Sequence, residues 1–211
     1  MNRCQFFNQM VLQQCERYLP YAYQQVEYLE GTGTQYINTG VVPLSSDVIA
    51  ATYQFTNIQV SDNSLFYIDN GAYTNNACGF SSSYYSNVGS YVCGWGGATT
   101  ISNPSPDLNK HILNLSNGVF TLDNNVLATR SGSVSLNKNL WLFGWNRNNS
   151  VAIYGKVKVF RFTITSSSNE KRIDLIPCYR KSDNKPGMYD PVSETFFTNA
   201  GTGEFTVGSS V

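Results

Sequence analysis

The sequence has little charge, no long apolar run and none of the usual metal-binding spacings. Charged residues make up 13% of the 211 positions, against roughly 25% in ordinary globular proteins. Lys and Arg together number 14, as do Asp and Glu, so we expect no long-range attraction to nucleic acid or anionic lipid. No stretch approaches the roughly 18 apolar residues of a membrane span, and the N-terminus lacks the apolar core of a secretory signal.

Cysteine and histidine are sparse, which limits the metal and redox chemistry open to the chain. The five cysteines include no CxxC pair, and the one histidine, His111, has no neighbouring ligand pattern. We predict free, mostly buried thiols, as in a protein made in a reducing cytoplasm, with a Cys78–Cys93 bridge as the alternative. No metal or cofactor is expected. Calcium is the exception to consider, since Asp62 and Asp69 offer oxygen ligands, although both also suit ordinary turns.

Aromatic and small polar residues take the place of the missing charge. The chain has 14 tyrosines and 12 phenylalanines, and Ser, Thr, Asn and Gly occupy positions where Lys and Glu are usual. Such a surface is neutral and rich in hydrogen-bonding groups. It suits sugars or other protein surfaces better than phosphate backbones. The same composition also fits a plain extracellular-type β domain.

The first 25 residues show a helical period. Phe7, Val11 and Tyr18 share a three-four spacing that gives an apolar stripe, and Pro20 should end the helix. A helix of this length needs a surface on which to bury its stripe. We interpret residues 1–25 as an attachment or oligomerisation segment, with a helix folded back on its own domain as the alternative.

From residue 26 onward the apolar period changes to two, which is typical of β-strands. Within the stretch 47–56, we expect Ile49, Ala51, Tyr53 and Phe55 to face the core. Many short strands with Gly- and Asn-rich turns follow, and no internal repeat is evident. This pattern indicates an all-β fold, an antiparallel two-sheet jelly-roll sandwich over residues 26–211.

The stretch 156–165 carries apolar side chains on both of its predicted faces. Val157 and Val159 fall on one face, whereas Phe160 and Phe162 fall on the other. Strands that are apolar on both faces are usually covered on both sides. We therefore predict a central strand that is buried on both faces.

Three stretches, taken in order, carry a family resemblance: VEYLEGTGTQYINTGVVP (26–43), LFGWNRNNSVAIYGKVKVFRFTI (142–164) and IDLIPCYRKSDNKPGMYDPVSETFFTNAGTGEFTVG (173–208). Together they resemble the concanavalin A-like, or laminin G-like, jelly-roll domains. Domains of this pattern are frequent in bacteriophage virion proteins and in surface proteins of gut bacteria. The resemblance implies a sandwich of two curved sheets that binds glycans or another protein, although many members are only structural.

Signals for catalysis are weak. Glycoside hydrolases of this fold need paired carboxylates, usually on one strand face, and the pair with matching parity, Glu170 and Asp174, lies at a turn and a strand end. A Ser-His-Asp or Cys-His site would have to use His111, which has no nucleophile motif near it. We interpret His111 as a hydrogen-bonded structural residue. We expect no catalytic site, with a hydrolase as the remote alternative.

Two stretches offer flat aromatic rings for the apolar face of a pyranose, together with amides and hydroxyls for its polar groups. If they meet at one rim of the sandwich, they form a glycan-binding platform of Tyr84, Tyr85, Tyr91, Trp95, Trp145, Asn146, Arg147 and Asn148. The alternative places Trp95, Trp145 and half of the tyrosines in the core or under loops, because large aromatic side chains are mostly buried.

We therefore expect a non-enzymatic structural protein of a bacteriophage virion, either a capsid-decorating fibre or a tail receptor-binding component. Residues 1–25 would bind other virion proteins and form a homo-oligomer, with a trimer favoured. Residues 26–211 would be displayed to bind a host-surface glycan. Such a protein is made in the host cytoplasm and exposed by lysis. The alternatives are a carbohydrate-binding adhesin of a bacterial cell surface and a domain that only shields or cements a capsid.

Overall fold

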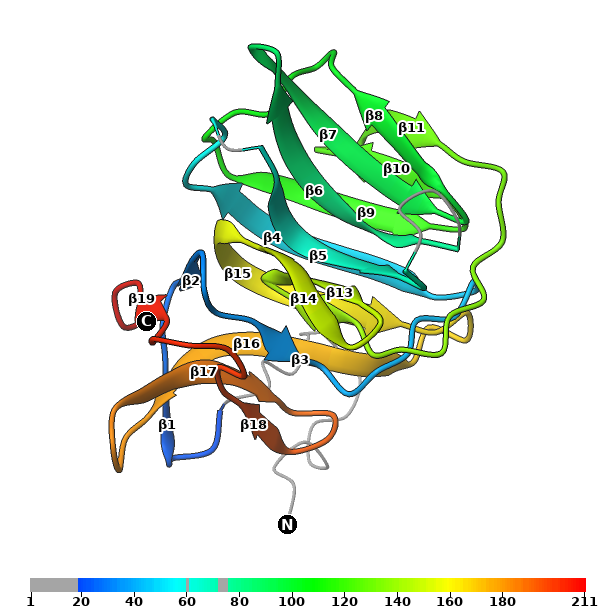
Figure 1. The fold of residues 1–211 in the computed structure, drawn as a ribbon. Coiled ribbons are helices and arrows are strands. Elements are labelled where there is room, and N and C mark those ends of the chain that lie inside the picture. The colour runs from blue at the N-terminus through cyan, green and yellow to red at the C-terminus, as the bar shows by residue number, and fades with distance from the viewer. Residues whose placement is uncertain (1–18, 60, 72–75) are drawn as a thin grey trace.

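The computed structural model describes residues 19–59, 61–71 and 76–211 of the chain. These residues form strands, turns and loops, and they include no helix that could cross a membrane. The strands make two sheets that pack face to face (Figure 1). This confirms the predicted all-β, antiparallel two-sheet sandwich, and the arrangement is compatible with a jelly roll. The helix predicted around Phe7, Val11 and Tyr18 lies outside the described residues.

The larger sheet has eleven strands and the smaller has eight. In order, the larger sheet contains β11 (Asn125–Thr129), β10 (Val119–Leu122), β9 (His111–Ser116), β4 (Val48–Phe55), β15 (Lys156–Thr165), β16 (Lys171–Arg180), β17 (Lys185–Asp190) and β18 (Thr195–Phe197), with β1 (Tyr23–Gln25), β2 (Leu29–Thr32) and β19 (Thr206–Val207) beside this path. The smaller contains β14 (Ser150–Tyr154), β13 (Gly144–Arg147), β5 (Asn63–Asp69), β6 (Cys78–Tyr85), β7 (Val88–Trp95) and β8 (Ala98–Ile101), with β3 (Ile37–Asn38) and β12 (Trp141–Leu142) beside it.

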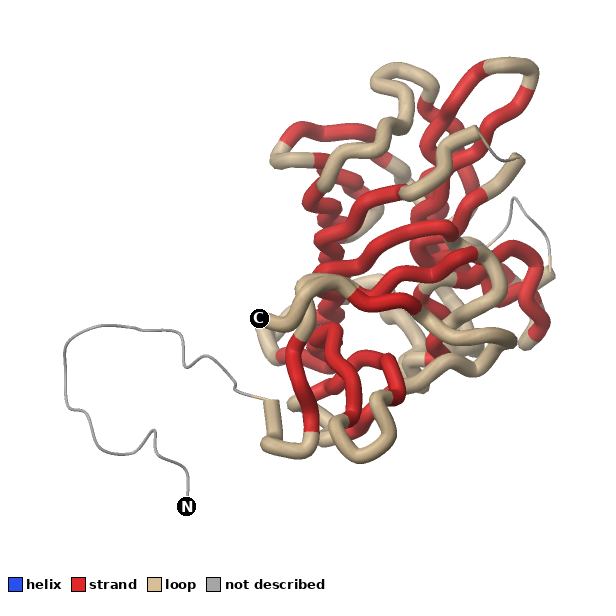
Figure 2. Tube along the Cα trace, turned by 90° about the vertical axis from the view of Figure 1, so that its left-hand side faces the viewer, coloured by secondary structure: helices blue, strands red, loops and turns tan. Residues whose placement is uncertain are grey.

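The C-terminal segment of the chain lies beside the first described strands. β19 pairs with β2, Ser210 bridges to Val26, and β1 pairs with β16. Residues 23–25, which the sequence grouped with the N-terminal segment, therefore contribute a strand to the larger sheet. Among the described residues, all strand pairs are antiparallel except β13 and β5, which run parallel. Figure 2, turned by 90°, shows the described chain as strands and loops alone.

The alternation in β4 shows why the two layers adhere. Ile49, Ala51, Tyr53 and Phe55 are each no more than 2% exposed, and the residues between them are half-buried. This confirms the face predicted from the period of two. The buried set joins one hydrophobic cluster between the sheets. Burial of each large apolar side chain there contributes about 2 kcal/mol to folding.

The alternation in β15 changes halfway along the strand. Val159 pairs with Tyr53 and Arg161 with Thr52, so Phe160 is an extra residue opposite β4. Such a β-bulge shifts the side-chain parity by one. The buried residues of the strand are consequently Val157, Val159, Phe162 and Ile164, while Lys158 and Phe160 are half-buried and Arg161 is exposed. The prediction of a central strand is confirmed, but the prediction that both faces are covered is wrong.

Candidate ligand-binding surface

Four residues of the predicted glycan platform are buried. Tyr91 and Trp95 are 1% exposed, and Trp145 and Asn146 are 0% exposed. Tyr91 and Trp95 belong to the core between the sheets, where Trp95 donates its indole N–H to the carbonyl of Gly132 at 2.9 Å. A ring needs an open face to stack against a sugar. In this structure the four side chains pack in the interior, as the alternative interpretation expected for Trp95 and Trp145.

The corner between β13 and β14 is held by a buried carboxylate. Asp69 is 0% exposed, and its Oδ2 accepts the indole N–H of Trp145 at 2.8 Å and the Nε and Nη2 of Arg147 at 3.2 Å. The guanidinium carbon of Arg147 lies 4.9 Å from the centroid of the Trp145 ring. Asn146 accepts the backbone N–H of Asn149 at 2.8 Å. Trp145, Asn146 and Arg147 thus build the corner itself.

The remaining platform residues form two groups that lie apart, one in the β6–β7 hairpin and one at the β13–β14 corner. Tyr85 is 80% exposed at the tip of the β6–β7 hairpin, and Trp95 belongs to the opposite end of that hairpin. Asn148 is exposed in the β13–β14 turn, and β5 separates β13 from β6. Tyr84 precedes Tyr85 in β6. The described side chains of the two stretches therefore do not gather into one aromatic platform.

A different pair of aromatic rings is accessible on the outer face of the larger sheet. Phe160, the bulge residue of β15, meets Tyr28 edge-on, with ring centroids 5.5 Å apart and 66° between the planes. The Nζ of Lys110 lies 3.8 Å from the Phe160 centroid, and the Nζ of Lys158 lies 4.3 Å from the Tyr28 centroid. Both rings are half-buried. They leave apolar area exposed in the middle of a sheet face, bracketed by two cations.

Two polar side chains flank Lys158 in the register of the sheet. Gln54 of β4 and Glu30 of β2 are its cross-strand partners on either side, so the three side chains project from the same face. Gln54 also donates its amide to the carbonyl of Leu108 at 2.7 Å, which ties the loop before β9 to the sheet. The six residues that we call the bulge surface are Tyr28, Glu30, Gln54, Lys110, Lys158 and Phe160.

His111 fixes the other end of the loop that carries Lys110. The Nδ1 of His111 lies 2.6 Å from Asp123 Oδ2, and its Nε2 lies 2.8 Å from Asp107 Oδ1. Burial alone would lower the pKa of His111, but the hydrogen bonds and charges of the two carboxylates outweigh it and raise the pKa. In the imidazolium form, both ring nitrogens donate, one to each carboxylate. The hydrogen bonding predicted for His111 is confirmed.

A shallow depression of about 370 Å³ lies along β14, the end strand of the smaller sheet. Tyr154 connects it to a second aromatic group, because its ring centroid lies 6.4 Å from that of Tyr36, which stacks on Trp141 at 4.5 Å. This volume is at the low end of the range for ligand pockets, so the depression has room for a small group only. Its lining residues are Gly33, Ser61, Asp62, Ala152, Ile153, Tyr154 and Lys156.

The acids weighed for hydrolysis are tied into structural contacts. Asp174 is 1% exposed, accepts the Nε and Nη2 of Arg161 at 2.9 and 2.8 Å, and pairs with Lys171. Burial alone would raise the pKa of Asp174, but these bonds and charges hold it below its usual value. A carboxylate that stays ionised does not suit a general acid. Among the residues the structure describes, no three His, Cys, Asp or Glu side chains could hold a metal ion together.

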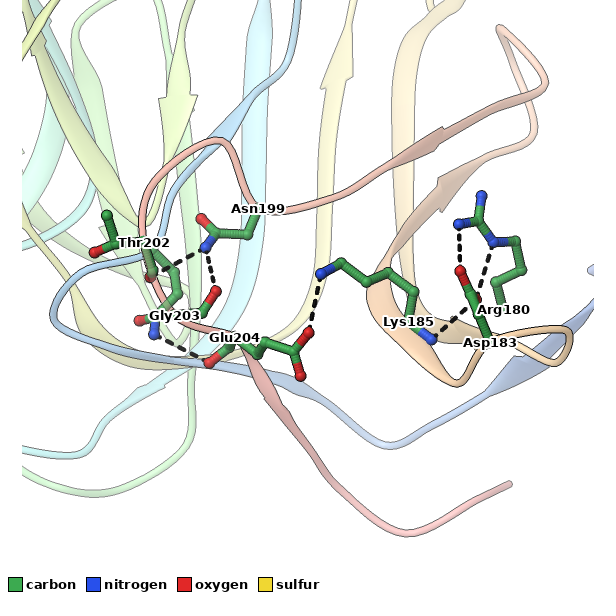
Figure 3. A network of polar contacts seen from close by, with 8 residues as sticks. Arg180, Asp183, Lys185, Asn199, Thr202, Gly203 and Glu204 are labelled. Atoms are coloured by element: carbon green, nitrogen blue, oxygen red, sulfur yellow. Dashed lines mark hydrogen bonds and ion pairs between the residues drawn. The ribbon is translucent and has the colours of Figure 1, made fainter.

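Polar contacts order the turns of the last motif stretch, as Figure 3 shows. Asp183 accepts two hydrogen bonds from Arg180, at 3.1 and 2.6 Å, and this contact lowers the pKa of Asp183 to about 2. Lys185 reaches Glu204 at 2.9 Å, and Asn199 donates to two carbonyls of the following turn. These contacts pin the β16–β17 turn to the segment before β19. They support fold maintenance as the role of this stretch.

Sequence reasoning missed the bulge surface because it treated the parity of β15 as constant. The signal was present: apolar residues on both predicted faces of 156–165 are also what a bulge produces, since one extra residue moves the second half of the pattern to the other face. Tyr28 and Phe160 are far apart in sequence, and only the pairing of β2 with β15 brings their neighbourhoods together.

The fold and this surface define the chain as an all-β sandwich protein with two half-buried aromatic rings flanked by cations. A scan against models of known protein families finds no match, and a search of curated proteins finds no similar sequence.

Proposed function

We propose that this chain is a non-enzymatic structural protein of a bacteriophage virion, as capsid decoration, head fibre or tail receptor-binding component. It displays a concanavalin A-like sandwich that binds glycan on a host surface. The observation that carries the proposal is the pair of half-buried rings, Tyr28 and Phe160, bracketed by Lys158 and Lys110. The binding site is placed on the bulge surface rather than on the platform predicted from sequence.

This surface has the chemistry that a pyranose requires. Aromatic area contacts the C–H face of the sugar, and nearby polar side chains bond to its hydroxyls. Gln54 and Glu30 provide acceptors, and the two lysines provide donors. A β-bulge re-aims a side chain without breaking the sheet, so Phe160 is presented from a rigid central strand. Rigid presentation limits the entropy lost when a ligand binds.

The virion assignment rests on the composition and on the family resemblance. A neutral surface rich in hydrogen-bonding groups suits display on a particle. The sequence of residues 1–18 predicts an apolar stripe for fastening or for a trimer. Size-exclusion chromatography with light scattering, on the full chain and on a variant lacking residues 1–18, tests the assembly role. We expect an oligomer that dissociates in the deletion. A monomer in both samples would remove that role.

A glycan array on the full chain tests the binding role, followed by titration calorimetry of the best ligand. We expect Phe160→Ala to weaken binding at least tenfold. The matched control is Tyr21→Ala, because Tyr21 is an exposed ring that also carries a lysine. The Nζ of Lys181, in the β16–β17 turn, lies 4.4 Å from the centroid of the Tyr21 ring. The control should bind like the unmodified protein. The proposal fails if no glycan binds at millimolar concentration, or if Phe160→Ala binds as well as the control.

An adhesin of a bacterial cell surface and a jelly-roll glycoside hydrolase are the alternatives. An adhesin would bind glycan through the same surface, and it is distinguished by a longer precursor with an export signal. A hydrolase would release a chromophore from a model glycoside, and it would lose that activity in Glu170→Gln or Asp174→Asn.

A further inference from the structure

The two lysines of the bulge surface are held in place without a counter-charge in contact. Lys110 and Lys158 each rest on a ring, at 3.8 and 4.3 Å, and neither forms an ion pair with any residue the structure describes. Other described cations of this sheet, such as Arg161 and Lys171, are paired with Asp174. A cation held on an aromatic ring keeps N–H groups that can donate to an anion.

Glu30 limits how much negative charge this surface accepts. It stands directly across from Lys158 in the sheet register, and its Oε2 accepts a hydrogen bond from Thr206 at 3.3 Å. Two ammonium groups and one carboxylate leave an excess of one positive charge. A ligand with one anionic group is attracted, whereas a densely sulfated chain meets the like charge of Glu30 at the same place.

We propose that the bulge surface binds a pyranose that carries a single carboxylate, of the uronic or sialic acid class. The sugar ring lies against the part of Phe160 and Tyr28 that the two ammonium groups leave uncovered. Its carboxylate accepts hydrogen bonds from Lys110 or Lys158, and a hydroxyl donates to Glu30. This inference rests on the proposed glycan-binding function and names the ligand class for the same site. It also explains why an almost neutral chain keeps two unpaired lysines on adjacent aromatic rings.

The position of Lys110 depends on two anchors, one at Gln54 within the bulge surface and one at His111 outside it. Gln54 bonds to the carbonyl of Leu108, and His111 is clamped between Asp107 and Asp123. The loop before β9 is therefore tied to the sheet on both sides of Lys110. Pre-positioned donors favour a ligand whose charge lies at a fixed place relative to its ring.

The test compares acidic sugars with neutral partners of the same shape, by titration calorimetry on the full chain. The probes are the methyl glycoside of galacturonic acid against that of galactose, and sialyllactose against its carboxyl-reduced form. We expect one acidic member to bind about tenfold more tightly than its neutral partner, the scale of one hydrogen bond to a charged group. The preference should shrink as salt rises from low to high concentration. It should collapse in Lys110→Met or Lys158→Met and persist in Lys181→Met, whose lysine rests on Tyr21.

The outcomes separate the inference from the function on which it rests. Equal binding of acidic and neutral sugars, with sensitivity to Phe160→Ala, would overturn the acidic ligand class and leave glycan binding intact. If no sugar binds, or if Phe160→Ala leaves sugar binding unchanged, both the acidic ligand class and the glycan-binding function are overturned. In Glu30→Gln, we expect affinity for a sulfated oligosaccharide to rise roughly tenfold; an unchanged affinity would remove Glu30 as the charge limit and contradict the single-carboxylate assignment.

Discussion

Phe160 meets Tyr28 edge-on at 5.5 Å, and the contact exists because Phe160 is passed over in the pairing of β15 with β4. Because of the bulge, two phenylalanines that are two residues apart in β15 lie on opposite faces of the sheet. Phe162 is 0% exposed in the core, whereas Phe160 lies half-buried on the outer face. One extra residue thus turns an apolar side chain outward without weakening the apolar face beneath it.

The bulge predicts different stability losses at these two positions. Phe162→Ala should lower the free energy of unfolding by about 3–5 kcal/mol, because it leaves a cavity between the sheets. Phe160→Ala should cost only about 1 kcal/mol, the scale of an aromatic pair at a partly exposed site. Urea denaturation of both variants measures the difference. Equal losses would mean that Phe160 is a core residue and that no bulge lies between Val159 and Arg161.

Asp69 should be one of the least replaceable residues of the smaller sheet. Asp69→Ala removes the acceptor that Trp145 and Arg147 share, and we expect a loss of about 3 kcal/mol because partners of a buried carboxylate lose their bonds. Asp69→Asn keeps an acceptor oxygen and should lose less. The control is Asp183→Ala, since the Asp183 pair with Arg180 is exposed and such pairs add little stability. If Asp69→Ala and Asp183→Ala shifted the urea midpoint equally, the buried Asp69 would be no more important for stability than the exposed Asp183.

The three described cysteines should be unreactive in the folded protein. Cys78, Cys93 and Cys178 are buried and free, and burial raises the pKa of each thiol to about 12. Because the thiolate is the reactive form, an aromatic disulfide reagent at pH 8 should label these residues only after denaturation. Peptide mass mapping identifies the labelled sites. A peptide pair joined by a Cys78–Cys93 disulfide, found without reducing agent, would contradict the free-thiol assignment.

The sequence predicted the layers of the fold better than its surface. Regular alternation in β4 identified the buried face correctly, since a strand without irregularity presents every second residue to the core. The same rule failed in β15, where the bulge at Phe160 inverted the parity. A bulge depends on how two strands pair. The apolar residues on both predicted faces of 156–165 are compatible with a bulge, but they do not distinguish it from a strand covered on both sides.

The predicted platform illustrates a second limit. Trp95 and Trp145 stand among Ser, Asn and Gly in the sequence, a setting that suits either an exposed ring or a ring packed closely on backbone. Gly118 fits the second setting for Trp95, because a Cβ there would lie 2.7 Å from Cδ1 of the Trp95 ring. The acceptors for the two indoles, Gly132 and Asp69, are distant in sequence. Which role a tryptophan takes was therefore decided by tertiary contacts.

The clamp around His111 should make stability depend on pH in a defined window. The pKa of His111 in the folded protein is raised above 6.5, so its stabilisation is fully present below pH 6.5, the pKa of the unfolded chain, and is lost as pH rises through the folded pKa. The pKa values of Asp107 and Asp123 are lowered below 3.8. Their stabilisation is present above pH 3.8 and is lost as pH falls through the folded pKa. The clamp is therefore strongest between these two limits.

Urea denaturation between pH 5.5 and 8.5 measures the upper limit. Because His111 is the only histidine of the chain, the unmodified protein should lose stability as pH rises, and His111→Gln should lack most of that slope. The groups that face the imidazole are Asp107, Asp123 and the Tyr53 ring, whose centroid lies 6.0 Å away. Burial raises the pKa of Tyr53 well above its usual value, so Tyr53 stays neutral in this range. If His111→Gln kept the slope, the pH dependence would belong to another group. The contacts of His111 with Asp107 and Asp123 would then not stabilise the loop that positions Lys110.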